Sequence, residues 1–197
     1  MARHLWVLGT IGIFTVVVAA AWAGEEMVAN PYYKFWAGSK PGSVAVHIEK
    51  TKLSGPEGAL VPDGIDEKQI VYKLVSVDPE HAIVEMVVTE QDFLGFVQSA
   101  PTRYIYPDKL KKSHLERILL DSGGKPGEET LNAAGQDMKC KTITGTIKGT
   151  GGEQTEFKLW LCNDVPGRIV KQVRTARQKG ETIAETTTTL KSFKNAQ

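Results

Sequence analysis

Histidine and cysteine are the side chains best suited to catalysis or metal binding in this sequence, and they are few. His47, His81 and His114 lie far apart, and none has a second histidine at the H-x-H or H-x-x-x-H spacing of a metal site. The sequence also contains no G-x-S-x-G motif, no phosphate-binding P-loop and no G-x-G-x-x-G. We therefore expect no catalytic residue, no bound metal and no cofactor, although a catalytic triad assembled from distant residues leaves no such motif.

The two cysteines, Cys140 and Cys162, are expected to form a disulfide across a hairpin. Residues 138–148 and 154–163 alternate in polarity and flank a Gly-rich loop around Gly151, a pattern typical of a β-hairpin. A turn centred on this glycine places the cysteines opposite each other, each eleven residues from the centre. Opposed strand residues have Cβ atoms about 4.5–5.5 Å apart, close to the separation that a disulfide requires.

The first 23 residues have the three parts of a secretory signal peptide. A short positive region precedes an apolar stretch at residues 5–20, and the small residues Ala21 and Ala23 fit a cleavage site. We expect residues 1–23 to be removed on export, which leaves one β-rich domain at 24–197 in the periplasm or outside the cell. An uncleaved membrane anchor is the alternative, but the apolar stretch is shorter than the about 20 residues that span a bilayer.

Charge is balanced, with 24 Lys and Arg residues against 23 Asp and Glu residues. A nearly neutral surface exerts no long-range attraction on nucleic acid or anionic lipid. We therefore expect no nucleic-acid partner, and no integral membrane span once the signal is cleaved. The partners that remain are a hydrophobic small molecule or lipid, and a protein of the cell envelope.

Alternating apolar and polar residues predict β-strands along most of the chain. Residues 44–49 form one such strand, whose apolar face is Val44, Val46 and Ile48 and whose other face carries Ala45, His47 and Glu49. Residues 168–178 and 181–193 form the last hairpin, which is polar and places Arg174 opposite Glu185.

Both faces of the hairpin at 68–77 and 82–92 are mostly apolar. Asp78 and Pro79 favour a type I turn between its strands, and pairing about this turn sets Tyr72 opposite Val87. Either the hairpin is covered on both sides, or one face lines an interior that takes up a ligand. Together with the aromatic connector that follows, this pattern predicts the ligand-binding residues Tyr72, Leu74, Val87, Phe93, Phe96 and Tyr104.

Two short helices are expected beside the strands. Asn30 is a capping residue and Pro31 suits the first helical position, so an aromatic-rich helix begins here and covers the core. Asp108 can cap a second helix that runs to about Leu120 with an apolar stripe. A short strand pair is the alternative for this second segment.

These elements predict a mainly β (α+β) fold, in which a long antiparallel meander forms a curved sheet or half-barrel with one or two short helices packed on it. An exported chain with a short N-terminal helix, long hairpins, a helix near the middle and a late cysteine pair resembles the LolA/LppX-like lipoprotein-carrier fold. In that family a half-barrel closed by helices holds acyl chains. The resemblance implies a non-enzymatic, exported binding or carrier protein for a lipid or other hydrophobic ligand, held between sheet and helix.

Two other readings of the sequence remain open. The stretch from Trp160 through Cys162 to Gly167 also resembles exported bacterial proteins of unassigned function, which implies no activity. The alternative to a carrier is a structural or protein-interaction module of the cell envelope that docks through a sheet edge or an exposed hairpin.

Overall fold

The computed structural model describes residues 26–54, 65–92, 95–112, 125–148 and 152–197. The expected signal peptide at 1–23 and the predicted ligand residue Phe93 lie outside these described residues. So does most of the helix expected between Asp108 and Leu120.

The described chain is mainly β, as predicted, and most of it forms one antiparallel sheet of ten strands. In chain order the strands of this sheet are β2 (Val44–Leu53), β3 (Ile65–Val77), β4 (His81–Asp92), β5 (Gly95–Gln98), β6 (Thr102–Pro107), β8 (Lys125–Ala133), β9 (Gln136–Lys148), β10 (Glu153–Leu161), β11 (Ile169–Gln178) and β12 (Glu181–Lys194).

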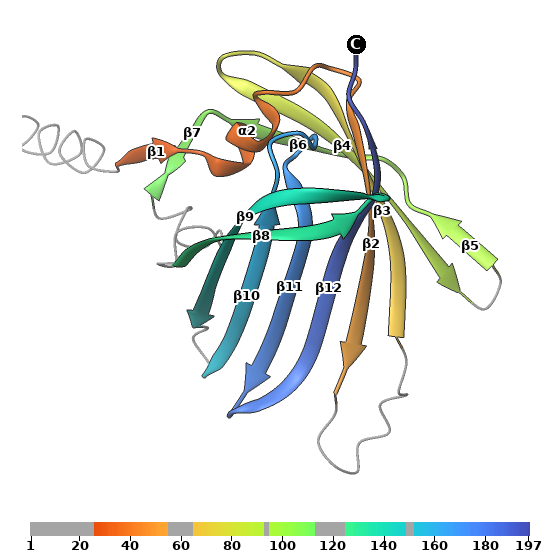
Figure 1. Ribbon diagram of the computed structural model, residues 1–197, viewed down its shortest axis with the longest axis vertical. Helices are drawn as coiled ribbons and strands as arrows, with labels where there is room; N and C mark the ends of the chain where they lie inside the picture. Colours follow the sequence, from red (N-terminus) through yellow and green to blue (C-terminus); the bar gives the residue numbers. More distant parts are fainter. Residues whose placement is uncertain (1–25, 55–64, 93–94, 113–124, 149–151) are drawn as a thin grey trace, which may run out of the picture.

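The sheet is a meander in which one pair of neighbouring strands, β2 and β12, is far apart in the sequence. Its strands follow the order β5, β4, β3, β2, β12, β11, β10, β9, β8, and β6 continues the line of β5 along the same side of β4. The last strand, β12, thus lies between β2 and β11 and joins the N-terminal hairpin to the C-terminal ones. Figure 1 shows the long strands β10, β11, β12, β2 and β3 side by side in a curved sheet. The second half of β9 runs beside β10, and β8 pairs with the first part of β9.

The helix expected at Asn30 and Pro31 is confirmed as α2 (Pro31–Trp36). The side chain of Asn30 accepts a hydrogen bond from the backbone N–H of Tyr32 at 3.0 Å, which caps the first turn. Its amide nitrogen also donates to the carbonyl oxygen of Pro107 at 2.8 Å. One buried side chain thus starts the helix and fixes it to the end of β6. Figure 1 shows where α2 and β6 lie in the fold.

A helix that begins at Asp108 is wrong for residues 109–111, whereas Lys112 is helical. Lys109–Lys111 instead form strand β7, which pairs with strand β1 (Met27–Ala29) in a separate two-stranded sheet. Leu110 is buried between two exposed lysines, the alternation of a strand with one covered face. A short strand pair was the alternative left open by the sequence. Lys109–Lys111 form one strand of such a pair with β1, and the residues from 113 to 120 lie outside the described part of the chain.

The register of the β3–β4 hairpin differs by one residue from the predicted one. Tyr72 pairs with Met86 rather than with Val87, because a β-bulge at Val75 shifts the ladder between Leu74 and Ser76. A one-residue shift turns the partner side chains to the opposite face. Val87 therefore faces away from Tyr72 and pairs with Val71 on the other side of the sheet.

A similar bulge displaces the last hairpin. The ladder between β11 and β12 shifts between Ala176 and Arg177, so Arg174 pairs with Thr186 and not with the predicted Glu185. The β9–β10 hairpin, in contrast, has the predicted register: Leu161 pairs with Lys141, and both residues are equidistant from Gly151.

The expected disulfide is wrong, because Cys140 and Cys162 are both free and buried. The ladder ends at the pair of Leu161 and Lys141, one residue before the cysteines would face each other. Cys162 already belongs to the following turn, where its N–H donates to the carbonyl oxygen of Arg168 at 2.8 Å. Its thiol lies 3.8 Å from a carboxylate oxygen of Asp164 instead.

Two apolar cores stabilise the fold. The first joins the β8–β9 hairpin to β10, β11, β12 and β2, and its buried members include Met138, Cys140, Trp160, Val170 and Leu190. The second lies under α2, where Phe35 and Trp36 pack with Leu74, Ala82 and Val84 of the β3–β4 hairpin. The candidate site adjoins this second core.

Candidate functional site

A small cavity of about 110 Å³ lies between α2 and the sheet. Its helix wall is formed by Tyr32, Phe35 and Trp36, whose spacing of three and four residues places them on one side of α2. Its sheet wall consists of side chains from β2, β3, β6, β11 and β12 and of the turn before β11: His47, Glu49, Tyr72, Tyr106, Pro166, Gly167, Ile169, Gln172, Arg174 and Thr188.

The turn before β11 closes one end of this cavity against Trp36. Gly167 has a φ of +72°, and a Cβ atom added there would lie 2.7 Å from Cζ2 of Trp36. Only glycine combines this left-handed backbone with so close an approach to an indole ring. The position of the helix therefore depends on Gly167 as well as on the Asn30 cap.

His47 is the most unusual residue of the cavity. Its side chain is only 4% exposed, and its Nε2 lies 2.8 Å from the carbonyl oxygen of Ile169. A carbonyl oxygen only accepts, so Nε2 carries the proton, and burial lowers the pKa of His47 despite this hydrogen bond. The ring is neutral, and its Nδ1 is a buried acceptor with no partner among the described residues.

The remaining polar side chains form a row across three strands. Gln172 on β11 pairs with Thr188 on β12, and Thr188 pairs with Glu49 on β2. The hydroxyl of Thr188 donates to Glu49 Oε2 at 3.1 Å, and Arg174 Nη2 donates to Gln172 Oε1 at 2.9 Å. One carboxylate and one guanidinium thus give the cavity no net charge beside the neutral histidine.

Three tyrosines, Tyr32, Tyr72 and Tyr106, line the cavity together with Phe35 and Trp36. Tyr32 stacks on Tyr106 with ring centroids 5.5 Å apart, and Tyr72 meets the His47 ring edge-on at 5.7 Å. Burial, reinforced by the nearby carboxylate of Glu49, raises the pKa of Tyr72 to about 12. Burial likewise raises the pKa of Tyr32 and that of Tyr106, so all three phenols are neutral at physiological pH.

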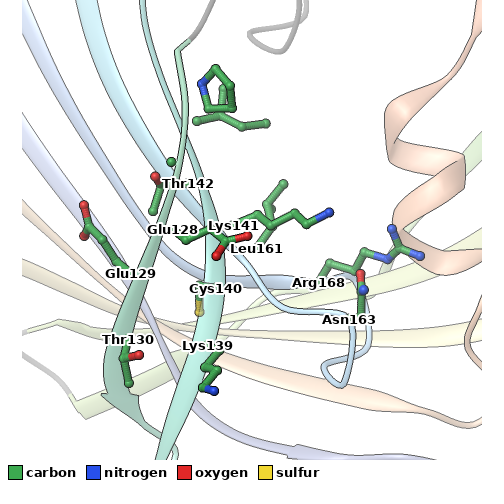
Figure 2. A pocket seen from close by; sticks show the side chains of 13 residues that line it. Glu128, Glu129, Thr130, Lys139, Cys140, Lys141, Thr142, Leu161, Asn163 and Arg168 are labelled. Atoms are coloured by element: carbon green, nitrogen blue, oxygen red, sulfur yellow. The ribbon is translucent and has the colours of Figure 1, made fainter.

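A second, wider hollow of about 1010 Å³ lies along β8, β9 and the segment after β10 (Figure 2). Figure 2 shows Lys141 and Glu128 on one side of this ladder and Arg168 and Asn163 across the groove. Most of its polar side chains are exposed to water. The described chain has one buried side-chain polar atom without a partner, and it belongs to His47, a residue that lines the cavity under α2. That cavity is therefore the stronger candidate site.

The structure brings three of the predicted ligand residues to this region. Tyr72 lines the cavity, and Leu74 is fully buried in the core beside it. Tyr104 is 37% exposed and stacks on Tyr106, with ring centroids 6.2 Å apart, so it lies at the cavity's aromatic edge.

Two further predicted residues, Val87 and Phe96, lie away from the cavity. Val87 lies on the face of the sheet opposite to Tyr72, because the bulge at Val75 shifts the register by one residue. Phe96 is 78% exposed on β5. Neither residue therefore contributes to the cavity, although the sequence pattern predicts both as ligand-binding residues.

The polar residues of the cavity were missed as a group. His47 and Glu49 had been assigned to the less apolar face of a strand, which suggests solvent exposure, whereas Ala45 and His47 are buried. The signal that could have identified them is the i, i+2 spacing itself, which places His47 beside Glu49 on one face of β2. Gln172, Arg174 and Thr188 reach the same place only through the pairing of β12 with β2.

Comparison of the chain with protein-family models, with curated proteins and with solved structures finds no match. No helix in the described segments is long and apolar enough to cross a membrane. Those segments also contain no group of three or more His, Cys, Asp or Glu side chains placed to hold a metal ion.

Proposed function

We propose that this protein is a non-enzymatic binding or carrier module that takes up a lipid or other hydrophobic ligand between its curved sheet and α2. The observation that carries the proposal is the cavity under α2, because aromatic walls with a few convergent polar groups are typical of ligand sites. The signal peptide expected from the sequence would place this activity outside the cytoplasm, in the periplasm or the extracellular space.

The size of the cavity limits what it holds. Pockets for whole drug-sized ligands measure about 300–1,000 Å³, whereas this one measures about 110 Å³. It therefore accommodates one end of a longer molecule. The rest of the ligand follows the aromatic path from Tyr106 to Tyr104, which leads from the cavity to the surface of β6.

A protein-interaction module of the cell envelope is the second candidate. Three large apolar side chains are exposed on β5 and β6, strands that lie along the outer side of β4: Phe96, Val97 and Ile105. Exposed apolar residues on an edge strand are a usual feature of surfaces that pair with another protein.

Native mass spectrometry separates these two functions. The full chain is expressed with export, purified without detergent and weighed, and we expect an added mass of lipid size that is lost on denaturation. Tyr106→Ala, which removes a cavity wall, is expected to lose this added mass, whereas Phe96→Ala retains it. Bare protein in the wild type would contradict the carrier function. Loss of the added mass in Phe96→Ala but not in Tyr106→Ala would indicate that the ligand binds at β5 and not in the cavity.

A further inference from the structure

The unpartnered Nδ1 atom of His47 specifies what kind of group can enter the cavity. This nitrogen is a lone-pair acceptor, since the ring proton is held on Nε2 by the carbonyl oxygen of Ile169. A buried acceptor without a partner loses the hydrogen bonds that water would have given it. The cavity is therefore complementary to a group that donates a hydrogen bond.

The neighbouring side chains offer both acceptors and donors. Glu49 lies two residues from His47 on the same face of β2, about 7 Å away along the strand, and an ionised carboxylate accepts several hydrogen bonds. On the other side of the row, the amide nitrogen of Gln172 and the guanidinium of Arg174 are donors, and both residues line the cavity. A group that both donates and accepts can satisfy both sides at once.

Charge disfavours the ionic alternatives. An ammonium group would be attracted by Glu49 and repelled by Arg174, and a carboxylate or phosphate would be attracted by Arg174 and repelled by Glu49. Since opposite charges from Glu49 and Arg174 already balance each other, a neutral group pays the smallest electrostatic penalty on burial. A hydroxyl is neutral and both donates and accepts.

We infer that the cavity under α2 binds a neutral, hydroxyl-bearing head group of the ligand, with one hydroxyl donating to Nδ1 of His47. This inference rests on the proposed function, because it specifies the head group of a ligand bound at that same site. Glyceride-like and other polyol head groups belong to this class. The stacked rings of Tyr32 and Tyr106 contribute an aromatic surface for the carbon skeleton of such a group.

A matched pair of ligands tests the inference on the wild-type protein. Monooctanoylglycerol and propyl octanoate share the same chain and ester, and only the first has two hydroxyls on its three-carbon end. Isothermal titration below the micelle concentration is expected to show at least about tenfold tighter binding of monooctanoylglycerol. His47→Phe, which removes the acceptor, is expected to bring the ratio of the two affinities close to one.

A second measurement on the wild type avoids any effect of the substitution on folding. The imidazole ¹⁵N resonances of His47 report on Nδ1 directly, and a hydrogen bond accepted from the glyceride shifts the Nδ1 resonance upfield. Propyl octanoate is expected to leave that resonance in place, and the spectrum of His47→Phe assigns it.

The outcomes distinguish the inference from the function on which it rests. Equal affinity for the two probes, or binding of monooctanoylglycerol without a shift of Nδ1, would overturn the inference while the carrier function stands. Absence of binding of either probe would also overturn it, and the carrier function would then be decided by native mass spectrometry alone.

Discussion

Nε2 of His47 donates a hydrogen bond to the carbonyl oxygen of Ile169 at 2.8 Å, although the two residues are 122 positions apart in the chain. The bond runs from β2 to the start of β11, past the strand β12 that separates them. Ile169 directly follows the turn that contains Gly167, which packs against Trp36 of α2. One buried histidine thus links the sheet, the turn and the helix that surround the candidate site.

The stability of the protein should fall in mildly acidic solution because of His47. Its pKa in the folded state is lowered from 6.5 by burial, so the unfolded chain binds a proton at a higher pH than the folded one. The contribution of His47 is complete above pH 6.5 and is lost as the pH falls from there to the lowered pKa, by at most about 1.4 kcal/mol per pH unit. Urea unfolding between pH 7.5 and pH 5 measures this slope. His47→Gln serves as the control, and an equal slope in both proteins would contradict the prediction.

Gly167→Ala should destabilise the protein more than Gly180→Ala does. Both glycines have positive φ, of +72° and +88°, so alanine is strained at either position by about 1–2 kcal/mol. Only at Gly167 does the new Cβ meet a side chain, at 2.7 Å from Trp36, whereas Gly180 has no atom within 4 Å. Denaturant unfolding is expected to show a further loss of about 1–3 kcal/mol for Gly167→Ala. Equal losses would mean that Trp36 does not pack as described.

Leu74 and Phe96 should respond very differently to truncation, although the sequence suggested one role for both. Leu74 is fully buried, so Leu74→Ala is expected to lower the free energy of unfolding by about 2–5 kcal/mol. Phe96 is largely exposed, and Phe96→Ala is expected to change it by no more than about 0.5 kcal/mol. Thermal and urea unfolding of the two variants measure the difference. A small effect of Leu74→Ala would indicate that this side chain faces a void and contacts ligand.

The two cysteines should react as buried thiols. Burial, with the neighbouring Cys162 as a weaker cause, raises the pKa of Cys140 and so disfavours its reactive thiolate. A thiol reagent is expected to modify neither cysteine in the native protein and both after denaturation without reductant. Intact mass spectrometry before any reduction provides the check. A mass two hydrogens lighter, with no thiol released on denaturation, would contradict the free state of Cys140 and Cys162.

Local features of the sequence predicted the parts of the fold that depend on neighbouring residues. The Asn30 cap and Pro31 specify the start of α2 through bonds within one turn. The Gly-rich loop sets the register of β9 and β10, because a short loop fixes which residues can face each other. Alternating residues identified most of the strands for the same reason.

The parts that were missed depend on residues distant in sequence. No turn residue in the sequence indicates the bulge at Val75. Because of this bulge, Tyr72 pairs with Met86 and not with the predicted Val87. Similarly, the alternation in β2 predicts that the face with Val44 and Val46 is more deeply buried than the face with Ala45 and His47. Residues brought from β11, β12 and α2 nevertheless bury the second pair more deeply. A candidate site assembled from five strands and a helix therefore cannot be predicted from the pattern of any short stretch of sequence.

Two tryptophans provide the most direct test of where the ligand binds. Trp36 lines the cavity under α2, whereas Trp160 donates from Nε1 to Glu129, which lines the groove on β8 and β9. Their indole ¹H–¹⁵N cross-peaks, assigned with Trp36→Phe and Trp160→Phe, can be followed while monooctanoylglycerol is added. We predict that the Trp36 cross-peak shifts with saturation and the Trp160 cross-peak does not. A saturating shift of Trp160 with Trp36 unchanged would contradict a ligand site between α2 and the sheet.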